Sequence, residues 1–104
     1  MKNEKYSPLP SYLAIGPSPL HGAGVFATED IPGGITIGIS HIYDPNFEHD
    51  FIRTPLGGFI NHCATPNCEL IDDEENMDYK RVKTLQKIQE GDELTLKYSL
   101  YKMD

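Results

Sequence analysis

The sequence predicts an all-β domain built from several short strands. Apolar residues nowhere recur at helical spacing over more than about three turns, so no long helix is expected. Short segments rich in β-branched and aromatic residues lie between turn-forming residues instead. The 104 residues also include 9 glycines and 8 prolines, a content typical of a chain with many turns.

Turn signals bound most of the predicted strands. Gly16-Pro17 closes the first strand, Pro32-Gly33-Gly34 leads into the third, and Glu90-Gly91-Asp92 opens the last. An acidic run at 72–76 separates two strands and predicts a hairpin with a wide, solvated tip. The segment 44–58 is mixed, and we expect one helical turn in it and otherwise loop. The predicted strands are residues 12–15, 24–27, 35–39, 68–71, 80–85 and 93–98.

Length and charge narrow the function classes. A chain of 104 residues is long enough for one domain and too short for two. Sixteen acidic against nine basic residues give a net charge of -7, the opposite of what a phosphate-tracking nucleic-acid binder needs. There is no apolar run near the roughly 20 residues that span a bilayer and no signal-peptide pattern. We therefore expect a soluble, intracellular, reduced domain that contacts neither nucleic acid nor membrane, and whose charge serves either solubility or attraction of basic peptides.

Three local patterns are candidates for a functional site. In the first, Gly22 and Gly24 flank Ala23; glycines allow a tight turn and close approach to a ligand, although such a pair is often only a turn. It lacks the third glycine of a dinucleotide-binding fingerprint. The second contains Asn61 and His62, which offer amide and imidazole groups to a ligand or satisfy backbone groups in a tight loop.

The third pattern is a Gly-Asp-Glu turn at 91–93, followed by a strand in which Leu94, Leu96 and Tyr98 share one face. Tyr98 is either a site residue or a core tyrosine whose hydroxyl is satisfied at the sheet edge.

Metal and thiol chemistry are disfavoured. Cys63 and Cys68 with His62 lack the second pair of ligands that a structural zinc site needs, so no metal is expected. His62 and Cys63 are adjacent, and neighbouring strand residues point to opposite faces, which argues against a thiol–imidazole pair. We interpret His41 and His49 as surface or packing residues.

Taken in order, the three patterns resemble the SET domain family of protein-lysine methyltransferases. The motifs are His-Gly-Ala-Gly-Val-Phe at 21–26, Phe-Ile-Asn-His-x-x-x-Pro-Asn-Cys at 59–68 and Gly-Asp-Glu-Leu-x-x-x-Tyr at 91–98, and the resemblance covers about residues 12–101. It implies a β-clip of small curved sheets around a pseudoknot, in which the C-terminal segment threads beneath the loop containing Asn61 and His62. We expect an N-terminal arm at 1–11 and a single SET domain at 12–104.

The resemblance also implies roles for individual residues. Tyr98 corresponds to the active-site tyrosine where cofactor and substrate meet. Tyr101 either walls the lysine channel or belongs to a frayed end, and Phe26 is expected in the core rather than in the pocket. The residues that correspond to the family's binding site for S-adenosylmethionine are Gly22, Ala23, Gly24, Asn61 and His62.

The implied function is S-adenosylmethionine-dependent methylation of a lysine in a basic protein segment; the alternative is a non-catalytic module that binds basic peptides. The cysteine-rich zinc module that closes the lysine channel in many relatives has no counterpart here. We expect residues 99–104, residues 1–11 or a second subunit to close it, so a homodimer is expected. The expected location is the cytoplasm of a bacterial or virus-infected cell, or the nucleus if the substrate is a histone.

Overall fold

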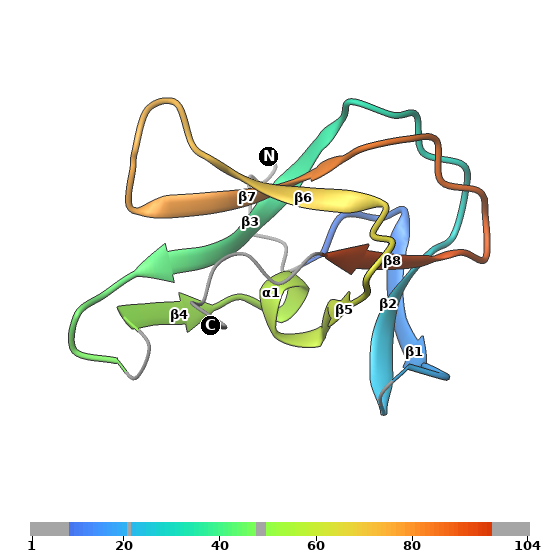
Figure 1. Ribbon diagram of the computed structural model, residues 1–104, viewed down its shortest axis with the longest axis horizontal. Helices are drawn as coiled ribbons and strands as arrows, with labels where there is room; N and C mark the ends of the chain where they lie inside the picture. Colours follow the sequence, from blue (N-terminus) through green and yellow to red (C-terminus); the bar gives the residue numbers. More distant parts are fainter. Residues whose placement is uncertain (1–8, 21, 48–49, 97–104) are drawn as a thin grey trace, which may run out of the picture.

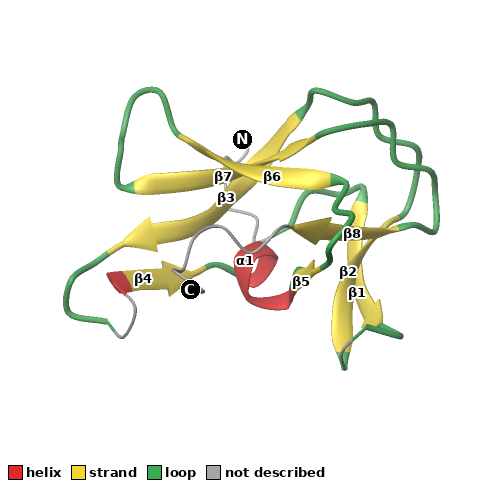
Figure 2. Cartoon of the chain, in the orientation of Figure 1, coloured by secondary structure: helices red, strands yellow, loops and turns green. Residues whose placement is uncertain are grey.

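Strands dominate the chain, as the sequence predicts (Figure 2). A computed structural model describes residues 9–20, 22–47 and 50–96. The elements are β1 (Leu13–Pro17), β2 (Ala23–Ala27), β3 (Thr36–Tyr43), β4 (Phe51–Arg53), α1 (Pro55–Phe59), β5 (Asn61–His62), β6 (Cys68–Asp72), β7 (Tyr79–Thr84) and β8 (Glu93–Leu96). No helix in these described ranges is long and apolar enough to cross a membrane.

The strands form one curled, hydrogen-bonded path (Figure 1). Its order is β1-β2-β8-β6-β7-β3-β4, and β5 pairs with β8 off this path. The all-β expectation is confirmed, and strands lie at all six predicted positions, although β1 runs through Gly16-Pro17 instead of ending there. Residues 97–98 of the last predicted strand lie outside the described residues. Pro17 is tolerated because β1 is an edge strand, where a missing N–H leaves no ladder bond unmade.

The single turn of helix expected within 44–58 is α1. Thr54 caps it, since its hydroxyl oxygen accepts a hydrogen bond from the Gly57 N–H at 3.3 Å. Pro55 takes the first helical position, where its missing N–H costs nothing. The helix therefore begins at a residue that the sequence marks clearly, just before the strand that carries Asn61.

β8 passes between two strands that are joined to each other by a short loop. Leu96 of β8 pairs with His62 of β5 and with Cys68 of β6, both in parallel register, so β5 and β6 must lie on opposite sides of β8. The connection at 63–67 therefore crosses β8, as Figure 1 shows. This arrangement agrees with the threading expected for the segment that contains Asn61 and His62.

Asn67 fastens this crossing loop to the strand beneath it. Its Nδ2 donates to the carbonyl oxygen of Glu93 at 2.9 Å, and its Oδ1 accepts from the Thr95 N–H at 2.8 Å. The Asn67 N–H in turn donates to the Thr95 hydroxyl at 3.2 Å. One side chain thus satisfies two backbone groups of β8 and holds the loop in register with it.

The core lies where these crossing strands meet. The core includes Ile31 and Ile88, which lie outside the strands and exchange reciprocal backbone hydrogen bonds of 2.7 and 2.8 Å. Phe26 is half-buried and lines a surface hollow with β1, so its expected place in the core is wrong; its neighbours Val25 and Ala27, on the opposite face of β2, are the buried ones. The buried apolar residues are Leu13, Val25, Ala27, Ile31, Leu56, Ile60, Cys68, Val82, Ile88, Leu94 and Leu96.

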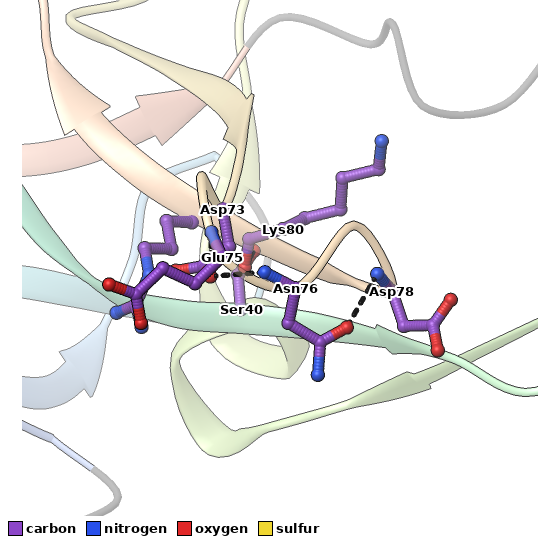
Figure 3. Close-up of polar contacts among 7 residues, drawn as sticks. Ser40, Asp73, Glu75, Asn76, Asp78 and Lys80 are labelled. Carbon is purple, nitrogen blue, oxygen red and sulfur yellow. Dashed lines mark hydrogen bonds and ion pairs between the residues drawn. The ribbon is translucent and has the colours of Figure 1, made fainter.

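The acidic run forms the tip of the β6–β7 hairpin, as predicted. The Asn76 N–H donates to Asp73 Oδ2 at 2.8 Å, and the Asp78 N–H donates to Asn76 Oδ1 at 3.0 Å (Figure 3). Asp73 also pairs with Arg81, and this hydrogen bond lowers the pKa of the Asp73 carboxyl. Some of the acidic side chains therefore bind groups within the hairpin itself and help to close its tip.

His41 of β3 is buried, with residues of β4 and α1 beside its ring. Its Nδ1 lies 2.8 Å from the Ser40 hydroxyl, and its ring meets that of Phe51 edge-on at 6.0 Å. Burial, and then the charges of Arg53, His62 and Lys80, lower the pKa of His41 from 6.5 to about 4. The interpretation of His41 as a packing residue agrees with this position.

We expect this histidine to make the fold acid-sensitive. Its pKa is lower in the folded than in the unfolded chain, so its stabilising effect is complete above pH 6.5 and is lost as the pH falls toward about 4. The loss amounts to at most about 3 kcal/mol of unfolding free energy. Urea titrations between pH 7 and pH 4 measure it, and His41→Gln should flatten the profile. An equal slope in both proteins would contradict the assignment.

Candidate functional site

The three sequence patterns meet in one hydrogen-bonded cluster of Ser18, Asn61 and Glu93. Ser18 lies just after β1, Asn61 begins β5 and Glu93 begins β8. The Ser18 hydroxyl donates to the Glu93 carboxylate, with Oγ 2.8 Å from Oε1 and 2.9 Å from Oε2. Asn61 Nδ2 donates to Glu93 Oε2 at 2.8 Å. Side chains 32 to 75 residues apart in sequence are thus joined through one carboxylate.

The sheet topology explains why these segments meet. β2 and β5 lie on the same side of β8, because β6 occupies the other side. β2 pairs with the start of β8, through Phe26 and Glu93, and β5 pairs with its end. At the point along β8 where its partner changes from β2 to β5, Asn61 Nδ2 donates to the carbonyl oxygen of Ala23 at 2.9 Å. The end of the glycine loop is therefore in direct contact with the Asn-His element.

The loop between β1 and β2 is a tight turn that glycine permits. The Ser18 N–H donates to the carbonyl oxygen of Gly22 at 2.9 Å, and the Leu20 N–H donates to the Ser18 hydroxyl at 2.9 Å. Gly22 has a φ of 39°, a left-handed conformation that glycine adopts without strain. Ser18 is thus both a turn residue and a member of the cluster.

Gly24 has a different reason to be glycine. A Cβ at this position would lie 2.2 Å from Glu93 Oε2 and 3.0 Å from the Ser18 Cβ. The space beside the backbone of β2 is already filled by the Glu93 carboxylate. The sequence predicts close approach of a ligand at Gly24, whereas the structure shows close approach of another side chain of this protein.

His62 follows Asn61 on β5 and is half-buried. Burial, and then the positive charge of Arg53, lower the pKa of its imidazole, which favours the neutral ring near pH 7. Its backbone pairs with Leu96 of β8, and the next N–H, that of Cys63, donates to the Leu96 carbonyl oxygen at 2.9 Å. The Asn-His element is therefore held by β8 along its whole length.

The two cysteines lie in different environments. Cys68 is buried in the core, and burial raises the pKa of its thiol to about 12, so it is inert. Cys63 is half-exposed, and hydrogen bonding to Thr65 lowers the pKa of its thiol. Among the described residues, no three His, Cys, Asp or Glu side chains lie together as a metal site would require.

Of the predicted site residues, Gly22, Ala23, Gly24, Asn61 and His62 lie within or beside the cluster. Tyr98 and Tyr101 lie outside the described residues, as does His49; Tyr98 follows the paired residue Leu96 by two positions in the sequence. Ser18 and Glu93 are site residues that the sequence patterns did not predict. Glu93 belongs to the third motif and Ser18 precedes the first, but nothing in their spacing showed that their side chains meet.

The acidic hairpin lies apart from this cluster. Figure 1 shows the β6–β7 tip and the β1–β2 hairpin at opposite ends of the molecule. A hollow of about 430 Å³ at the acidic tip is lined by Asp72, Asp73, Glu74, Glu75 and Arg81, among others. The acidic surface at the hairpin tip is therefore distinct from the surface built by the three motifs.

Comparison with known proteins points to one family. The family model of the SET domain matches residues 40–99, which is more than half of the chain. A Plasmodium falciparum protein assigned as a histone methyltransferase has a similar structure, with 22% identity, a TM-score of 0.70, and coverage of 92% of this chain and 100% of that chain. The methyltransferase domain of human PR domain-containing protein 2 is similar at 19% identity and a TM-score of 0.66, with coverage of 92% and 82%, respectively. No curated protein sequence matches the chain.

Proposed function

The chain belongs to the SET domain family, and from this premise we propose that it is an S-adenosylmethionine-dependent protein-lysine N-methyltransferase. The observation that carries the proposal is the joining of the glycine loop, the Asn-His element and the Gly-Asp-Glu strand through Ser18, Asn61 and Glu93. If these three positions served only the stability of the fold, apolar side chains packed against one another could take their place. Their convergence is what a site assembled from several loops requires.

The groups at this point fit the cofactor. S-adenosylmethionine carries an ammonium, a carboxylate and an adenosyl group, and these need both donors and acceptors. The loop at Gly22–Gly24 offers backbone groups, with open space beside Gly22, and Asn61 offers a side-chain amide. We propose that these residues and the backbone of His62 hold the cofactor. When bound, it supplies an electrophilic methyl group on a sulfonium.

The protein's own task is to present an uncharged amine. A free lysine has a pKa near 10.4, so the neutral form costs about 4.6 kcal/mol at pH 7. A dry channel lowers that pKa by desolvation, and water can carry the released proton away without a dedicated base. We propose that Tyr98 orients the amine through its hydroxyl, and that Tyr101 walls the channel. We also propose the homodimer as one way to complete that channel.

Methylation of a basic protein tests the function directly. We expect the full chain, incubated with labelled S-adenosylmethionine and a panel of basic proteins including histones, to transfer label to lysine. Mass spectrometry identifies the modified residue and the number of methyl groups. Asn61→Ala should abolish both cofactor binding and transfer. Saturable cofactor binding without transfer to any basic protein would argue against the proposed substrate class, and an absence of cofactor binding would argue against the enzyme itself.

The alternative is a non-catalytic module that captures basic peptides. The net charge of -7 and the exposed acidic tip of the β6–β7 hairpin favour it. Calorimetry separates the two functions, because the module gives heat with a lysine-rich peptide and none with the cofactor. A binding that weakens on reversing the charge of Glu74 and Glu75 would place the peptide on the hairpin.

A further inference from the structure

We propose that Glu93 is a positioning residue, which sets the orientation of the Asn61 amide and holds the Ser18 loop in place for the cofactor. The effect on cofactor binding rests on the proposed function, whereas the hydrogen bonds of Glu93 do not depend on it. Glu93 is half-buried at the first position of β8, and its two carboxylate oxygens contact Ser18 and Asn61 at 2.8 to 2.9 Å. Asn61 joins the same segments, since its Nδ2 also lies 3.2 Å from the Ser18 hydroxyl oxygen.

The Glu93 carboxylate and the Ala23 carbonyl together determine which way the Asn61 amide faces. An amide group has one end that donates and one that accepts, and the two ends have nearly the same shape. Asn61 Nδ2 faces Glu93 Oε2 at 2.8 Å and the Ala23 carbonyl oxygen at 2.9 Å. An ionised carboxylate and a carbonyl can only accept, so the nitrogen must point toward them. The Asn61 oxygen then points to the other side, and the amide presents one fixed face.

The backbone holds Glu93 firmly enough for this task. Its carbonyl oxygen accepts from Asn67 Nδ2 at 2.9 Å, and its Cα pairs with that of Phe26 on β2. Gly24 leaves the space in which the carboxylate lies, since a Cβ there would come within 2.2 Å of Oε2. A side chain anchored on a strand and enclosed by two neighbours positions its partners more accurately than one on a free loop.

Replacing the acceptor by a donor tests this role. In Glu93→Gln the shape is kept, but one oxygen becomes an NH₂ group, which must face either the Ser18 hydroxyl or the Asn61 amide nitrogen. We expect the side-chain amide signals of Asn61 in a ¹⁵N–¹H NMR spectrum, identified by their loss in Asn61→Ala, to shift or broaden. Calorimetry with S-adenosylmethionine should show about tenfold weaker binding, as expected when a hydrogen bond to a charged group is lost.

Two further variants keep the test decisive. Glu69→Gln makes the same change at an exposed strand residue and should leave the Asn61 signals and the affinity as in the wild type. Glu93→Asp keeps the charge but withdraws the carboxylate, so its cofactor binding should be weaker than that of the wild type and tighter than that of Glu93→Gln. The comparison with the wild type still tests the role if the glutamine variant does not fold. Unshifted Asn61 signals and unchanged affinity in both Glu93 variants would overturn the proposal. Shifted signals in a chain whose wild type binds no cofactor would uphold the positioning role and refute the proposed function.

Discussion

Tyr98→Phe should lower methyl transfer by about a hundredfold or more while cofactor affinity changes by less than about twofold. The substitution removes one hydroxyl and keeps the ring, so the shape of the site is conserved. A hydroxyl that orients the amine acts mainly in the transition state, and the loss of one such oriented group typically costs two to three orders of magnitude in turnover. In the proposed site, cofactor binding relies instead on Asn61, His62 and the glycine loop. Single-turnover assays with calorimetry on the same preparation measure both quantities.

Tyr101→Phe is the matched control for this experiment. It makes the same change three residues further along the sequence. If Tyr101 only walls the channel, its ring is what matters, and removal of the hydroxyl should change turnover by less than about threefold. Equal losses in the two variants would assign the effect to general disturbance of the C-terminal segment. Equal turnover of Tyr98→Phe and the wild type would refute the role given to Tyr98.

Strand positions were predictable where local chemistry decides them. The six predicted strands are each marked by β-branched or aromatic residues between turn residues, and α1 is marked by Thr54 and Pro55. β4 and β5 were not predicted, because strands of three and two residues are too short to show an alternating pattern. They form because β3 and β8 supply their partners: β3 is the preceding strand for β4, whereas β8 is distant in sequence from β5.

Several residues of the candidate site were predictable from the sequence, but the hydrogen bonds that join them were not. The motifs identify Gly24 and Asn61, and the resemblance places them near a cofactor. The link through Glu93 depends on β8 lying beside β2 and β5 at once, which is a property of the sheet topology. Glycine at position 24 is therefore explained by the Glu93 side chain, which fills the volume next to it, and not by a ligand. Phe26 was misplaced because an aromatic residue in a strand can face either side of a sheet, and the sequence does not say which side is covered.

Gly57→Ala should destabilise the fold by at least about 3 kcal/mol, an effect at the upper end of overpacking substitutions. A Cβ at position 57 would lie 2.0 Å from the carbonyl oxygen of Ser40 and 3.1 Å from Cε1 of His41. The first contact is with backbone in β3, which cannot rotate away. The same Ser40 oxygen accepts from the Thr54 N–H at 2.9 Å, so moving it would also disturb the start of α1.

Gly58→Ala provides the comparison that isolates this contact. It makes the same substitution one residue later in the same helix, where a Cβ would meet only the Arg53 Cβ at an ordinary 3.9 Å. Alanine is up to about 1 kcal/mol more favourable than glycine within a helix, so this variant should be neutral or slightly stabilised. Urea unfolding of both variants gives the difference. A similar midpoint for the two would mean that α1 can move off β3, and because α1 leads directly into β5, cofactor affinity in Gly57→Ala would then show whether that movement reaches Asn61.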